Sequence, residues 1–206
     1  RPLHFNTENT MKKLAKLQAP LSMSQIDFRV QSVNKGKYVT ILAYKDARVD
    51  MQRLDDVVGP LGWKRRHLRD NHNCVVSIFD AESNQWISKE DTGTESNAEA
   101  QKGLASDSFK RACFNWGIGR ELYDYPSIQF QLSQDEVMET TNGGWRPSYK
   151  LNLKEWKWYA EWDVDGKVSY LGCRDANDQV RFTWGESKAQ KEKRLKAEAK
   201  AKKEAA

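Results

Sequence analysis

Basic side chains concentrate in a short segment whose spacing points to contact with a polyanion. Residues 64–69 read KRRHLR and directly follow Trp63. Side chains of a β-strand alternate between its two faces, so Lys64 and Arg66 would share one face that is wholly basic. Such a face either meets a polyanion or protects an edge strand, because sheets commonly blunt exposed edges with charge. The residues alone leave both interpretations open.

A second basic set surrounds the longest predicted helix, which spans about residues 96–116. Apolar residues recur there at helical spacing and form one stripe, and the basic residues Lys110 and Arg111 project to either side of it. Cations late in a helix also interact with its dipole, by about 0.3–1 kcal/mol. That interaction explains one basic residue better than it explains four around a single helix. The four are Lys102, Lys110, Arg111 and Arg120.

Aromatic residues are numerous, with eight tryptophans and seven tyrosines. Aromatic faces beside a basic groove hold single-stranded nucleic acid without reading its sequence. Trp156, Trp158 and Trp162 alternate in the chain, however, and this spacing favours a buried strand face for these three.

The sequence gives little support for catalysis. It contains no G-x-x-x-x-G-K-[ST] motif, which excludes a P-loop nucleotide site. His72 and Cys74 form half of a zinc site without a second pair, so we expect no metal. The acidic residues Asp80, Glu90 and Asp91 could serve a metal-dependent nuclease acting on single-stranded DNA, which stays the alternative. Charged residues are common beside turns, so solvated strand ends explain these three carboxylates more simply than a nuclease site does. We therefore expect a protein that is not an enzyme and has no cofactor.

Length and charge suggest one domain followed by a charged tail. The 206 residues carry a net charge of +5, of which residues 186–206 hold +4, with eight basic residues and four glutamates. We expect residues 1–185 to form the domain and the tail to be disordered or partly helical. No apolar run is long enough for a membrane span, and three scattered cysteines indicate a reducing, cytoplasmic setting.

The elements that would position these residues follow from hydrophobic periodicity. We predict an α+β fold in which an antiparallel β-sheet meander packs on the long helix. The predicted helices span 7–18, 46–58 and 96–116, and the strands of the meander span 62–69, 73–80 and 85–92. Residues 96–99 fit a capping box at the start of the long helix. Residues 140–147 are expected to form a mobile loop, and a second β-meander is expected over about 154–185.

Several motifs together resemble a known family. The sequence reads TGTE at 92–95, DSFKRA at 107–112 and WGIGRELY at 116–123, preceded by YKDAR at 44–48 and LDDVVGP at 54–60. In this order they resemble the single-strand annealing proteins of the Rad fifty-two superfamily, most closely its Sak-type phage and prophage members. The resemblance covers about residues 38–130 well and the 168–184 hairpin more loosely.

The resemblance implies a β-β-β-α core that assembles into an oligomeric ring. Single-stranded DNA would lie in a basic groove of this ring, and complementary strands would anneal without ATP during recombination and repair. The implied partners are single-stranded DNA, annealing intermediates and further copies of the chain. A single-strand-binding protein is a further expected partner, and a membrane is not.

The resemblance also implies which residues bind DNA. The two backbone-binding residues of the family's long helix fall on Lys110 and Arg111. An arginine opening the first core helix falls on Arg48, and a lysine earlier on the long helix falls on Lys102. A further basic residue of some relatives is Phe114 here. Two expectations follow: either the groove is less charged at this position, or Lys64, Arg66 or Arg120 substitutes for the missing residue.

Overall fold

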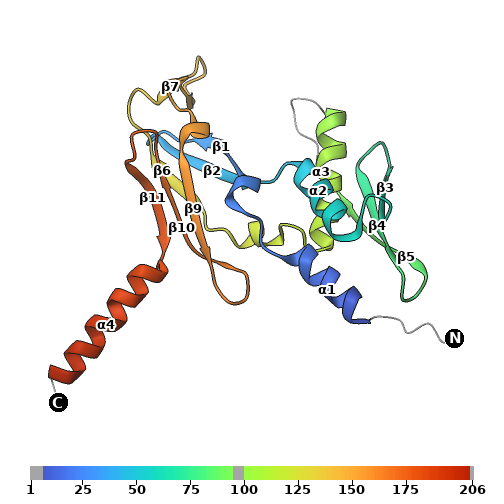
Figure 1. Cartoon of the computed structure of the whole chain (residues 1–206). Coiled ribbons are helices and arrows are strands. Elements are labelled where there is room, and N and C mark those ends of the chain that lie inside the picture. The colour runs from blue at the N-terminus through green and yellow to red at the C-terminus, as the bar shows by residue number, and fades with distance from the viewer. Residues whose placement is uncertain (1–6, 95–99, 205–206) are drawn as a thin grey trace. The chain divides into compact units, whose positions relative to one another are not determined.

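The computed structural model describes residues 7–94 and 100–204 (Figure 1). Their contacts divide into two compact units. The first comprises the chain up to Asp27 together with Lys45–Tyr123, and the second comprises Phe28–Tyr44 and the chain from Asp124 onward. That residues 1–185 act as one domain stays a prediction. None of the described helices is long and apolar enough to cross a membrane.

The first unit contains the predicted sheet and long helix. Strands β3 (Trp63–Leu68), β4 (Asn73–Asp80) and β5 (Gln85–Thr92) form an antiparallel sheet in that order. Helix α3 (Ala100–Asn115) packs against β4 and β5. This arrangement confirms the α+β class and the antiparallel meander on a long helix. The predicted capping box at 96–99 lies outside the described residues.

Alternation along β4 creates the core of this unit. Cys74, Val76 and Ile78 point to the same face and are buried, where they meet Phe109 and Trp116 of the apolar stripe predicted on the helix. The indole Nε1 of Trp116 donates a hydrogen bond to the Val76 carbonyl at 3.0 Å. The stripe therefore fixes which sides of α3 turn away from the sheet.

Two further helices complete the first unit. Helix α1 (Thr7–Gln18) packs against α2 (Ala47–Val58), and α2 packs against α3. Asp46 caps α2 by accepting a hydrogen bond from the Arg48 amide, and Gly59 follows the helix at a φ of +80°. A positive φ of this kind suits glycine, so the chain turns where Gly59-Pro60 predicts the helix to end. The short 3-10 helices of this unit are η1 (Met23–Gln25) and η2 (Arg120–Asp124).

The second unit holds two antiparallel sheets. The larger has the order β6-β2-β1-β8-β7. Its strands are β1 (Asp27–Val33), β2 (Tyr38–Tyr44), β6 (Ile128–Gln131), β7 (Val137–Glu139) and β8 (Trp145–Pro147). The smaller sheet is the C-terminal meander β9 (Lys157–Trp162), β10 (Val168–Arg174) and β11 (Val180–Gly185), introduced by η3 (Leu153–Glu155). Helix α4 (Lys188–Glu204) follows it.

The structure differs from the sequence prediction at residues 140–147. Part of this segment is strand β8, which pairs with β7 through Glu139 and Trp145. Both strands have only three residues, too few for alternation to show in the sequence. The tail, expected to be disordered or partly helical, forms α4 and has no buried residue.

Of the three alternating tryptophans expected on a buried strand face, Trp156 is buried but precedes β9, whereas Trp158 and Trp162 belong to β9 and are half-buried. Trp158 stacks on Phe28 with ring centroids 3.8 Å apart.

Candidate nucleic-acid interface

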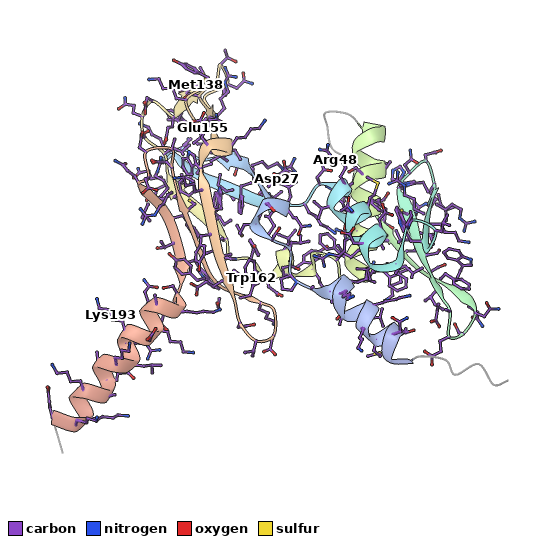
Figure 2. All side chains as sticks on the ribbon, in the orientation of Figure 1. Asp27, Arg48, Met138, Glu155, Trp162 and Lys193 are labelled. Carbon is purple, nitrogen blue, oxygen red and sulfur yellow. The ribbon has the colours of Figure 1, made fainter. Side chains whose placement is uncertain are left out.

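Two of the predicted DNA-binding residues, Arg48 of α2 and Lys110 of α3, both act on the carboxylate of Asp46, which caps α2. Figure 2 shows Arg48 at the first turn of α2, where 83% of its side chain is exposed. Its Nε is 2.9 Å from the Asp46 carboxylate. Hydrogen bonds from the Arg48 side chain and amide lower the pKa of Asp46, and the charge of Lys110 on α3 adds to this shift. One acidic group therefore faces two cations from different helices.

A buried ion pair lies close to these cations. The Lys45 ammonium donates hydrogen bonds to the Asp50 carboxylate of α2 and, at 2.8 Å, to the carbonyl of Ile118, which follows α3. It also lies 4.0 Å from the centre of the Phe114 ring. Burial raises the pKa of Asp50 to about 6, although Lys45 opposes this shift. Burial likewise lowers the pKa of Lys45. This pair ties α2 to the segment that follows α3.

Arg111 lies on the other side of α3, toward the end of β5. Its Nε is 3.5 Å from Oδ1 of Asp91, whose second oxygen accepts a hydrogen bond from the Asn115 side chain at 2.9 Å. Side-chain exposures of 39% for Arg111 and 30% for Asp91 leave part of each side chain open to solvent, although the Arg111 Nε itself is buried. A phosphate could therefore approach Arg111 without opening the core.

Two more cations gather at the C-terminal end of α3. Lys89 Nζ and Arg120 Nη2 both donate to the Asn115 carbonyl at 3.0 Å, and Arg120 Nε donates to the Phe114 carbonyl at 3.0 Å. They bind the last carbonyl groups of the helix, which carry its negative partial charge. Arg120 thus has a structural role in addition to its predicted one. Lys89 was not identified as a candidate from the sequence, because the polar residues around it show no periodic pattern.

The structure separates Lys64 and Arg66 from the cations of α3. In β3, Lys64 pairs with Ser77 and Arg66 with Val75, on the sheet face opposite the buried Val76 and α3. The Lys64 ammonium lies 4.1 Å from the centre of the Trp86 ring on that outer face. Strand β3 is also an edge strand, so its charges suit edge protection. Lys102 belongs to α3, but its side chain lies outside the described residues.

The acidic residues do not form a metal site. Asp80 ends β4 and pairs with Gln85, whereas Glu90 and Asp91 lie near the opposite end of β5 and point to opposite faces of the sheet. Among residues 7–94 and 100–204, no group of three or more His, Cys, Asp or Glu side chains could hold a metal ion. The geometry therefore gives no support to the nuclease alternative.

The fold and these positions define a class of protein. A helix on a three-stranded antiparallel sheet carries cations on both of its exposed sides, and a second helix adds Arg48 at its first turn. This is a β-β-β-α module whose helical layer suits a phosphate backbone.

Comparison with known proteins agrees with this class. Residues 72–142 match the Rad52/22 family of double-strand break repair proteins. The chain is 32% identical over 114 residues to the single-stranded DNA-binding protein DdrA of Deinococcus radiodurans, a match that covers 54% of each chain. It is 28% identical over 170 residues to DdrA of Deinococcus deserti, covering 81% of this chain and 79% of the relative.

These matches confirm the resemblance to the Rad52 superfamily. The match spans about half the length of the Deinococcus radiodurans protein. The family match includes β4, β5 and α3, and thus Lys110, Arg111 and Arg120, whereas Arg48, Lys64 and Arg66 precede it. The narrower likeness to Sak-type proteins stays a prediction.

Proposed function

We propose that this protein binds single-stranded DNA and anneals complementary strands without ATP, in recombination and repair. The observation that carries the proposal is the placement of Lys110 and Arg111 on either side of α3, with Arg48 nearby at the start of α2. The Rad52/22 match and the DdrA relatives, which are named single-stranded DNA-binding proteins, support it. Lys64, Arg66, Lys102 and Arg120 stay secondary candidates for phosphate contact.

Annealing requires no reaction chemistry from the protein. Complementary strands repel each other through their phosphates but gain about 1.4 kcal/mol per stacked base-pair step once paired. A protein that neutralises the phosphates and leaves the base edges free removes the repulsion and permits pairing. Lysine and arginine side chains on a helical layer meet this requirement, because contacts with the backbone carry no sequence information. Binding, rather than catalysis, is therefore the proposed activity.

Binding should depend strongly on salt and hardly at all on DNA sequence. Each phosphate contact releases counterions, so the logarithm of the association constant should fall against the logarithm of salt concentration with a slope of about −0.7 per contact. Fluorescence anisotropy with oligonucleotides of differing sequence, at several salt concentrations, measures both quantities. An affinity that does not change with salt would show that phosphates are not the target.

We further propose that the protein works as an oligomeric ring, with one continuous groove across copies of the chain. Light scattering at low micromolar concentration should then give a mass several times that of the 23.8 kDa chain. A monomeric mass both with and without single-stranded DNA would contradict the ring. Single-strand binding itself would still be tested by the salt experiment.

A further inference from the structure

The meander of the second unit has one covered face and a more open face, on which Glu161 and Gly172 are nevertheless buried. Ala160, Leu171 and Cys173 are buried on the covered face, where Trp158 stacks on Phe28 of β1. The residues between them alternate to the other face, and there Tyr159 is 57% exposed. Packing of the core does not explain why an aromatic ring is exposed in this strand.

Tyr159 is held in one orientation on this open face. Its hydroxyl donates a hydrogen bond to Glu161 at 2.9 Å, and the other oxygen of Glu161 accepts the Lys188 amide at the start of α4 at 2.7 Å. Tyr170 on β10 lies beside it, with ring centroids 6.2 Å apart. Gly172, which pairs with Tyr159, leaves room for Tyr170, whose hydroxyl would be 2.9 Å from an added Cβ. The two rings thus form a fixed aromatic surface.

Cations border this aromatic surface. Lys157 and Arg174 are register partners on the same face, two residues along their strands from Tyr159 and Gly172. That separation is about 7 Å. Both cations lie 3.8 Å from the exposed carboxylate of Asp178, which is a weak, solvent-accessible ion pairing. Arg174 Nη1 also donates a hydrogen bond to the Asp178 carbonyl at 2.8 Å, which leaves its other guanidinium groups available. A polyanion can therefore compete for them.

The two tyrosines and the two cations line a hollow of about 430 Å³. Ser187, just before α4, and Ala189 in its first turn also border it. Helix α4, on which Figure 2 labels Lys193, has eight basic and three acidic residues. It continues directly from this sheet (Figure 1). Fixed aromatic rings, bordering cations and a basic helix are the combination that holds single-stranded nucleic acid, since every base has a face that can stack.

We propose that Tyr159 and Tyr170 form a base-stacking site for single-stranded DNA, with Lys157 and Arg174 contacting its backbone. This site belongs to the second unit and uses none of the residues proposed to contact phosphate on α3. It rests on the proposed function and adds a role for the bases. An acidic peptide could use the same cations, but it would not distinguish DNA that has bases from DNA that lacks them.

The test compares two oligonucleotides of equal length and charge, oligothymidine and its abasic counterpart. Tyr159→Leu should weaken oligothymidine binding about five-fold or more and change abasic binding less than about two-fold, with the salt slope unaltered. Tyr159→Phe keeps the ring for stacking but loses the hydrogen bond to Glu161, so it should bind oligothymidine more tightly than Tyr159→Leu and within about three-fold of the parent. Tyr149→Leu is the matched control, because Tyr149 is 90% exposed and lies outside the hollow.

Each outcome decides between the two proposals. Unchanged oligothymidine binding by a folded Tyr159→Leu protein, or equal losses on both oligonucleotides, would overturn the stacking site and leave the proposed function intact. Failure of the parent protein to bind either oligonucleotide would overturn both. Photocrosslinking of the parent to an oligonucleotide containing 5-iodouracil requires no variant to fold. The crosslinked peptide should contain Tyr159 or Tyr170, and crosslinks confined to other peptides would overturn the stacking site.

Discussion

Replacing Lys110 and Arg111 together by alanine should weaken single-strand binding by about 100-fold at low salt, because each charge-assisted contact contributes about 1.5 kcal/mol or more. The salt slope should also flatten by about 1.4 in total, or about 0.7 for each lost phosphate contact. Neither side chain belongs to the apolar stripe of α3, and both are only half-buried. The free energy of unfolding should therefore change by about 1 kcal/mol or less. Anisotropy titrations and denaturant unfolding of the same preparations measure the two effects.

The control for this double variant removes the same charge elsewhere. Lys150→Ala/Lys154→Ala alters two side chains of the second unit that no proposal uses, and its affinity should stay within about two-fold of the parent, since charges that contact no phosphate release no counterions. Lys64→Ala/Arg66→Ala tests the outer sheet face, and a loss as large as that of the α3 variant would extend the groove to it. A Lys110/Arg111 variant that binds and anneals like the parent would contradict the assignment of DNA binding to α3.

Asp50→Ala should destabilise the protein by about 3–5 kcal/mol, because it leaves the Lys45 ammonium buried without a countercharge. Of the contacts described above, Lys45 then keeps its hydrogen bond to the Ile118 carbonyl and its cation–π contact with the Phe114 ring. Unfolding in urea, followed by circular dichroism, gives this difference from the shift in midpoint at constant slope.

Two further variants show whether a loss of stability comes from the buried pair or from a general effect on α2. Asp56→Ala removes an exposed carboxylate of the same helix and should change stability by about 0.5 kcal/mol or less. Lys45→Met/Asp50→Leu replaces both charges with apolar side chains, and it should recover most of the loss because no buried charge remains unpaired. A parent-like midpoint for Asp50→Ala would show that the pair contributes little.

Much of the first unit could be predicted because its elements are long and periodic. Helix α2 begins and ends within one residue of the expected range, and β4 and β5 have the expected bounds. The apolar stripe of α3 also indicated the sides to which Lys110 and Arg111 turn. Strands β6, β7 and β8 could not be found in the same way, because a strand of three or four residues is defined by its neighbours and not by its own pattern.

The composition of the site was harder to predict than its elements. Alternation gave β3 two faces without indicating which one meets the helix. The residue that could have indicated the inner face is Trp63, because its ring packs on Phe109 of α3 with ring centroids 5.9 Å apart. Its neighbour Lys64 therefore lies on the outer face. Lys89 reaches α3 only because β5 pairs with β4, a contact that the sequence around it does not encode.

The discontinuity of the first unit has a consequence for synthesis of the chain on the ribosome. The Leu21 amide donates to the Glu121 carboxylate at 2.6 Å, so this unit closes only after residue 121 has left the exit tunnel. Strand β2 emerges long before its partner β6, as the pairing of Ile41 with Ile128 shows. Nascent chains that expose unpaired strands are prone to aggregate. Translation must therefore pass Glu121 before the first unit can close, and Ile128 before β2 has its partner strand. Fragments that end earlier should be poorly soluble.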